Sequence, residues 1–227
     1  MWAIAKKEFK QYFLSPIGYI YIGIFLLTCS LFFYLDLFNY QSAEFASMFG
    51  SVATILTFIV PMITMRMFAE ERKNGTEQLL LTSPRSVTQI VLGKFIAAAF
   101  VVLISTLSTL IYFVILNFFG KPQIGKSLVT ILGFSLLAIS YVSFGMFASS
   151  LTESQVVAAV ISIGFFLLSW FLPGMISSLG NYSLMYAFYD SFMQGTISIT
   201  NLVLLLSFTV MFIIFTIMVI QRRKNVK

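Results

Sequence analysis

The sequence has no histidine and only one cysteine among its 227 residues. Without histidine it has no Ser-His-Asp triad and no histidine ligand for a metal. A single cysteine forms no disulfide within the chain and no Cys/His metal cluster. Cys29 lies inside an apolar run, where its expected role is packing. The chain is therefore predicted to have no catalytic residue, no cofactor-binding residue and no metal site of its own.

Charge is also scarce. Charged residues make up only 10% of the chain, hydrophobic residues make up 59%, and the mean hydropathy is +0.96. Soluble domains have about 45 to 50% apolar and about 25% charged residues. The composition therefore predicts a polytopic membrane protein. At about 20 residues per crossing, the length allows six membrane helices with little left over.

Six apolar runs are long enough to cross a hydrocarbon layer of about 30 Å. They are too long and too continuously apolar for barrel strands, and lipid offers no water to an irregular backbone. The predicted fold class is an all-α membrane protein with six transmembrane helices. The expected spans are residues 17–38, 46–68, 92–119, 127–149, 154–173 and 199–220.

Basic residues are concentrated on one side of these spans. Three precede the first run, five lie between the second and third, and four follow the sixth, whereas only Lys121 and Lys126 lie opposite. Cytoplasmic loops contain the excess of Lys and Arg. A multi-pass protein of the inner (plasma) membrane with both termini in the cytoplasm is therefore predicted. Nucleic-acid binding is not needed to explain the net charge of +6, because Lys and Arg residues beside the inner leaflet interact with anionic lipid.

Residues 1–15 have the pattern of an amphipathic helix lying on the membrane surface. Lys7, Glu8 and Gln11 lie opposite the apolar face, and Ser15-Pro16 ends the helix. Such an interfacial elbow would bury its rings in lipid while its lysines reach water. The alternative is a simple flank of the first span. The predicted membrane-facing residues are Trp2, Phe9, Tyr12 and Phe13, together with Ala5.

A charged hinge separates the second and third apolar runs, over residues 66–85. Asn74-Gly75 is a helix stop signal, so the second helix should extend beyond Pro61 before it ends. Thr76 can cap a short helix, with Glu77 and Gln78 in its first turn. Residues 86–89 (SVTQ) fit a capping box that opens the next helix.

Three consecutive leucines, Leu79 to Leu81, follow in this short helix, and Pro84 ends it. Exposed apolar clusters usually mark contact sites, so the favoured explanation is that these leucines bind in an apolar pocket of a partner protein. The alternative is that the leucines fold back onto the membrane surface. The hinge contains basic residues beside its acidic ones, and this mixture favours solvated ion pairs over acid-base catalysis.

The hinge, TMRMFAEERKNGTEQLLLTSP (64–84), with IVLGKF (90–95) after it, resembles the cytoplasmic loop of type-2 ABC exporter permeases. Within that family the chain is most similar to the gliding-motility and copper-processing branch. Weaker similarities extend the resemblance over most of the chain: KEFKQYF (7–13), SPIGY (15–19), SSLTESQ (149–155) and DSFMQGTI (190–197).

The resemblance implies a six-span half-transporter, residues 16–227, with a cytoplasmic coupling loop at 69–92. It implies a second permease, identical or homologous, and cytosolic ABC ATPase subunits that bind the ATP and magnesium. Thr76 to Leu81 would be the coupling helix. The implied ATPase interface consists of Glu70, Glu71, Arg72, Lys73, Gly75, Thr76, Glu77, Gln78, Leu79, Leu80, Leu81 and Pro84.

Residues 120–127 (GKPQIGKS) match the P-loop pattern letter for letter. A working P-loop needs a buried strand before it and an Asp on another strand for magnesium. The flanking runs are instead predicted membrane helices on the outer side. We therefore interpret the match as coincidence, with Lys121 and Lys126 contacting lipid headgroups.

Two other features bear on function. Residues 174–198 are too short and broken for two spans, so they form either a segment that dips into the outer leaflet or a surface loop. No ionisable residue lies at mid-span, whereas ion-driven transporters place such residues there. The favoured function is the permease subunit of an ATP-driven exporter, with a possible outer-side accessory protein. The alternatives are a membrane scaffold that docks a cytosolic partner, and an ion-coupled carrier.

Overall fold

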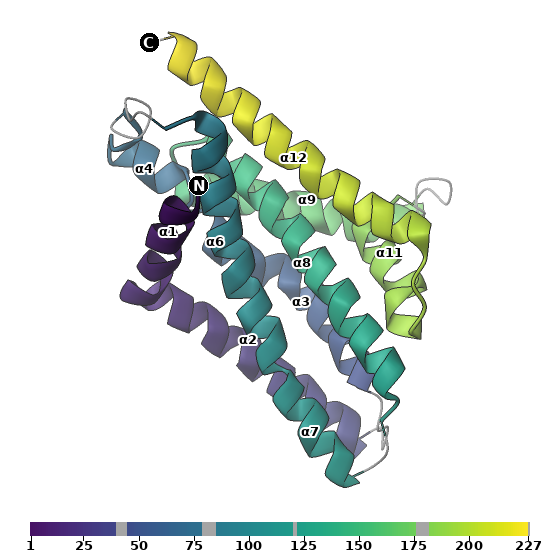
Figure 1. The fold of residues 1–227 in the computed structure, drawn as a ribbon. Coiled ribbons are helices and arrows are strands. Elements are labelled where there is room, and N and C mark those ends of the chain that lie inside the picture. The colour runs from purple at the N-terminus through teal and green to yellow at the C-terminus, as the bar shows by residue number, and fades with distance from the viewer. Residues whose placement is uncertain (40–44, 79–84, 120–121, 176–181, 227) are drawn as a thin grey trace.

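A computed structural model describes residues 1–39, 45–78, 85–119, 122–175 and 182–226, and these residues form helices without a strand among them. Figure 1 shows the arrangement. The elements are α1 (Trp2–Leu14), α2 (Pro16–Tyr34), the π-helix η1 (Leu35–Asn39), α3 (Phe45–Thr64), α4 (Ala69–Lys73), α6 (Val87–Ser108), α7 (Leu110–Phe119), α8 (Ile124–Leu151), α9 (Gln155–Met175), α11 (Leu184–Asp190), the 3-10 turn η2 (Phe192–Gln194) and α12 (Ile199–Val226).

Five helical segments of the described chain are long and apolar enough to cross a membrane. They are Pro16–Leu37, Phe45–Lys73, Val87–Phe118, Ile124–Leu151 and Ile199–Asn225. The predicted all-helical membrane fold is confirmed. The predicted span at 154–173 forms α9, whose described apolar part, Gln155–Phe171, is shorter than the other five. A sixth crossing therefore stays a prediction.

Helices α3 and α8 form the centre of the bundle, and α8 packs on α3, α6, α9, α12 and η2. In α3 and α8, 67% of the most apolar 18-residue stretch is buried inside the chain, against 22% for α2 and 28% for α12. The aromatic core surrounds Phe134 of α8, whose ring contacts those of Phe25, Phe49 and Phe188. Helices α2 and α12 therefore present most of their apolar surface to the outside of the bundle.

The second and third apolar runs are each interrupted. Helix α3 extends beyond Pro61 to Thr64, as predicted, and the chain turns through residues 65–68 before α4 begins. The third helix begins at Val87, directly after its predicted cap Ser86, and breaks at Thr109 between α6 and α7. Thr109 Oγ1 donates to the Thr106 carbonyl, 2.6 Å away, and this local bond accompanies the break.

The P-loop-like segment follows α7, a helix, and Gln123 is the N-cap residue of α8. The strand that a phosphate-binding loop requires is absent from the described residues on either side.

The described part of residues 174–198 forms α11 and η2, which pack against α8, α9 and α12 at the end of the molecule away from the chain termini (Figure 1). Phe188 and Phe192 are buried. The Phe192 side chain fills the space beside Gly133 of α8, and Thr130 Oγ1 donates to the Phe192 carbonyl at 3.1 Å. The place of this segment relative to a membrane stays a prediction.

Helix α1 ends at Leu14, Ser15 after it has an extended backbone, and Pro16 opens α2, as the sequence predicts. Helix α1 packs along α6 (Figure 1). Its bundle-facing side includes Glu8, so the prediction that Glu8 lies opposite the buried face is wrong. The reason is that Lys94 of α6 attracts this carboxylate, as described below. Phe9, Tyr12 and Phe13 are half-buried against the bundle, and Trp2 remains 68% exposed.

Candidate functional site

The charged hinge lies at the same end of the molecule as both chain termini (Figure 1). Three helices contact its described part, namely α6, the end of α8 and the end of α12, and Lys94 of α6 connects it to α1. Together these contacts determine what a force on the hinge would move.

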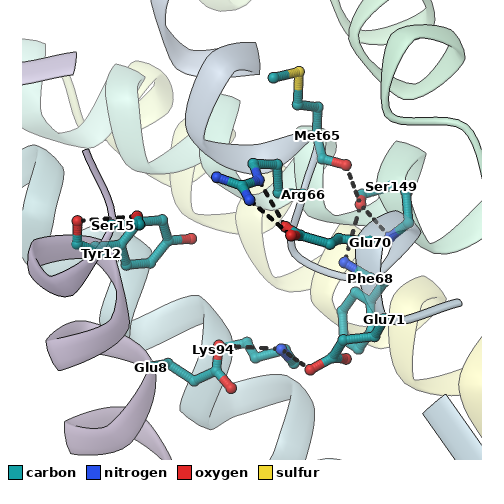
Figure 2. A network of polar contacts seen from close by, with 11 residues as sticks. Glu8, Tyr12, Ser15, Met65, Arg66, Phe68, Glu70, Glu71, Lys94 and Ser149 are labelled. Carbon is teal, nitrogen blue, oxygen red and sulfur yellow. Dashed lines mark hydrogen bonds and ion pairs between the residues drawn. The ribbon is translucent and has the colours of Figure 1, made fainter. Parts of the chain in front are cut away.

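Ser149 of α8 organises the break between α3 and α4. Its Oγ accepts hydrogen bonds from the backbone N–H groups of Phe68 and Ala69, both at 3.1 Å, and donates to the Met65 carbonyl at 3.0 Å (Figure 2). In a continuous helix the Ala69 N–H would bond to the Met65 carbonyl and the Phe68 N–H to the Thr64 carbonyl. One side chain from another helix therefore replaces the local hydrogen bonding and fixes the direction in which α4 leaves the bundle.

Helices α3 and α8 also approach closely at this point. Gly145 lies one turn before Ser149, and the side chain of Thr64 occupies the space where a Cβ would stand at Gly145. Two consecutive turns of α8 thus contact the end of α3 and the start of α4.

Two ion pairs anchor the acids of α4. Arg66 binds Glu70 through two hydrogen bonds, Nε to Oε2 at 2.6 Å and Nη2 to Oε1 at 2.7 Å. Lys94 of α6 donates to Glu71 Oε1 at 2.7 Å and to Glu8 Oε2 of α1 at 3.1 Å (Figure 2). Lys94 therefore joins the elbow helix, the hinge and α6 through one ammonium group.

Lys94 is buried. Its side chain is 3% exposed, and its Nζ lies 5.5 Å from the centre of the Phe68 ring. The second carboxylate oxygen of Glu71, Oε2, is buried and has no hydrogen-bond partner in the described chain. Nearby, burial raises the pKa of the Tyr12 phenol above its ordinary value, and the Glu8 carboxylate raises it further, so Tyr12 is neutral. A lysine so enclosed depends on its two carboxylates for compensation.

Arginines from two elements meet the last turn of α8. Arg72 Nη1 donates to the Leu151 carbonyl at 3.3 Å and its Nη2 pairs with Glu153 Oε1 at 2.9 Å. Arg223 of α12 donates to the Ser150 carbonyl and pairs with Glu77 Oε1 of the hinge at 3.2 Å. The free carbonyls at a helix C-terminus attract cations, and here those cations come from the hinge and from α12.

A family model described as "ABC-2 family transporter protein" matches residues 2–226. The chain belongs to this family. It is also 28% identical, over 129 residues, to proteins named "Probable multidrug ABC transporter permease YbhS" from Escherichia coli strain K12 and from Escherichia coli O157:H7. The matched region is 57% of this chain and 33% of each relative, so the chain spans about a third of the length of these curated relatives.

Family membership confirms the type-2 ABC transporter permease family predicted from the hinge, and the branch within that family stays a prediction. In this ABC-2 family chain the predicted interface residues divide into two groups. Glu70, Glu71, Arg72 and Glu77 are engaged in the ion pairs above. The exposed ones are Lys73, Gly75, Thr76 and Gln78.

The predicted helix stop at Gly75 and the predicted cap at Ser86 are confirmed. Helix α4 ends at Lys73, and Gly75 has a φ of 71°, the left-handed conformation that favours glycine after a helix. Thr76 Oγ1 donates to the Glu71 carbonyl at 3.2 Å, and Glu77 and Gln78 are helical, so the role of Thr76 as the cap of the short helix stays a prediction. Ser86 caps α6 by accepting from the Gln89 N–H. Leu79, Leu80, Leu81 and Pro84 lie outside the described residues.

Sequence reasoning missed the residues that hold the hinge from outside, namely Glu8, Lys94, Ser149, Glu153 and Arg223. Only Lys94 gave a usable signal, because a lysine seven residues inside an apolar helix needs an acidic partner. Among the described residues, no three cysteine, aspartate or glutamate side chains converge as metal ligands would. The site is thus a set of ion pairs and helix-end contacts suited to holding and moving a loop.

Proposed function

We propose that the chain is the permease half of an ATP-driven exporter, in which separate cytosolic ABC ATPase subunits bind ATP and magnesium and drive the movement. One observation supports this most: the hinge contacts α6, α8 and α12 at a single end of the bundle, and Lys94 of α6 links it to α1. A force applied to the hinge would therefore reach four helices at once. The proposal includes a second permease, identical or homologous to this one.

The proposed contact with the ATPase is the short helix from Thr76 to Leu81, with the remaining interface residues predicted above around it. Its leucines would be apolar anchors, each contributing about 1.5 to 3 kcal/mol on burial in a partner's groove. Charged groups around such anchors affect orientation and the rate of encounter more than affinity.

Replacing Leu80 with aspartate tests this function. We expect normal insertion and folding, because the hinge lies at the end of the bundle, together with loss of ATPase recovery on purification and loss of transport-linked ATP hydrolysis. Gln123→Asp at the start of α8 is the matched control and should change neither. If Leu80→Asp retains full partner binding and transport, the membrane scaffold becomes the better explanation.

We propose further that α9 is the sixth crossing and that both termini are cytoplasmic. In a Cys29→Ser background, a cysteine placed at Gln123 should react with an impermeant thiol reagent in intact cells. A cysteine placed at Asn74 should react only after lysis. Both positions are exposed in the structure, so access to the reagent depends on the side of the membrane. The reverse pattern would invert the proposed orientation.

The substrate class follows only from general features. The predicted outer loops are short, so the chain offers little outer surface to a large soluble cargo. A lipid-like, peptide or otherwise amphipathic substrate is therefore the proposal, and the relatives named as multidrug permeases are compatible with it. Membership of the gliding-motility and copper-processing branch, and an outer-side accessory protein, also remain proposals.

A further inference from the structure

The end of the molecule that contains the hinge and both chain termini is its charged end. There the described acids form ion pairs within the chain, whereas many of the bases do not. Every described acid on this end forms an ion pair within the chain. The pairs are Glu8–Lys94, Glu71–Lys94, Glu70–Arg66, Glu77–Arg223 and Glu153–Arg72. The fold therefore leaves this end without an uncompensated exposed carboxylate among the described residues.

The bases outnumber these acids, and the surplus is exposed. Seven exposed lysine and arginine side chains at this end have no ion-pair partner in the described chain, and they form two groups. The elbow lysines are Lys6, Lys7 and Lys10 of α1. The hinge bases are Lys73, Arg85, Arg222 and Lys224.

The hinge bases lie on described residues near the proposed coupling helix in the sequence, or on the end of α12 that contacts the hinge. Lys73 is the last residue of α4, and Arg85 immediately precedes the Ser86 cap of α6. Arg222 and Lys224 flank Arg223, which binds Glu77 of the hinge, so the end of α12 belongs to the same surface. The elbow lysines instead share α1 with the exposed Trp2 and Leu14, a combination suited to a membrane surface.

We propose that the cytosolic ATPase meets the hinge with an acidic surface, and that the four hinge bases bind it and steer its approach. This inference rests on the proposed function. Unpaired charges of one sign attract a surface of the opposite sign and repel one of the same sign. A lipid headgroup is the less favoured partner for this group, because Arg223 ties the end of α12 to the hinge and the Ser150 carbonyl rather than leaving it on the bundle's lipid-facing side.

The test measures association rates. The full chain is placed in nanodiscs of zwitterionic lipid, and the probe is the ATPase subunit that co-purifies with the native chain, purified separately. Association is followed at about 50 mM and about 500 mM salt, which shortens the screening length severalfold. The hinge variant replaces all four hinge bases with glutamine. The matched control replaces the three elbow lysines with glutamine.

For the wild-type chain we expect association to slow about tenfold or more at high salt. The hinge variant should associate about tenfold more slowly at low salt and lose most of its salt dependence, while the elbow variant should resemble wild type. Thermal melting and cysteine labelling check that each variant keeps its fold and orientation. If the hinge variant does not fold, single glutamine substitutions of the four hinge bases replace it, and each should have a partial effect.

Three outcomes would overturn the inference: an unchanged rate of association with the ATPase in the hinge variant, an equal loss in the elbow variant, or, when binding to anionic-lipid vesicles is measured in parallel, a loss of vesicle binding alone. The last would assign the hinge bases to lipid. Leu80→Asp in the same assay separates this inference from the proposed function. If Leu80→Asp abolishes binding and the hinge variant does not, ATPase docking stands and the acidic surface is wrong. If neither affects binding, both are wrong.

Discussion

Replacing Lys94 with methionine is expected to destabilise the chain by about 3 to 5 kcal/mol. The substitution keeps the apolar stem and removes the ammonium, which leaves the carboxylates of Glu8 and Glu71 close together without a cation in a buried site. Because the same ammonium connects α1, the hinge and α6, the loss should also release the hinge. Denaturant titration of the purified chain in detergent, alongside recovery of the ATPase, measures both effects.

Two controls separate the buried pairing from a general loss of charge. Lys73→Met removes a lysine from the exposed end of α4 and should change stability by no more than about 0.5 kcal/mol. Combining Lys94→Met with Glu8→Gln and Glu71→Gln removes all three charges and should recover most of the lost stability, since a neutral buried set has no charge to compensate. A Lys94→Met chain as stable as wild type would mean that the three residues do not form the buried cluster.

Replacing Gly145 with alanine is expected to destabilise the chain by about 1 to 3 kcal/mol. The added Cβ would overlap Thr64 Oγ1, and the nearest atoms lie close to the α3 backbone and cannot swing away as the end of a long side chain would. Gly133→Ala should have a similar cost, because its Cβ would overlap the Phe192 side chain at its base. Thermal melting in detergent measures both.

Gly164 of α9 provides the matched control, since a Cβ at this position meets no atom within 4 Å. Gly164→Ala should leave stability unchanged or raise it by up to about 1 kcal/mol through helix propensity. Equal effects at all three glycines would indicate that backbone flexibility, and not helix contact, explains their presence.

The two central glycines also show why α8 matters to the proposed mechanism. One end of α8 contacts α3, α4, the hinge and α12 through Gly145, Ser149 and the final carbonyls. The other end contacts η2 through Gly133 and Thr130. Interfaces of this kind leave little room for compression, so a shift of α8 at one end is transmitted to the other.

The sequence by itself determined the class of protein, most of the helices and the local signals of the hinge. Runs of 20 or so apolar residues admit only helices in lipid, whatever their neighbours are. The stop at Gly75 and the cap at Ser86 were also predictable, because each depends on one residue's backbone conformation or side chain and on atoms within three residues of it.

The tertiary structure alone decided how the hinge is held. Lys94 binds Glu71, which lies 23 residues before it in the sequence, and Glu8, which lies 86 residues before it. No local sequence pattern specifies such a pairing. The break after Thr64 likewise depends on Ser149, whose hydroxyl comes from a helix about 80 residues later and takes over the backbone hydrogen bonds of a helix that would otherwise continue. Residues that bind a neighbouring helix are specified by packing geometry, which periodicity and propensity along the chain do not encode.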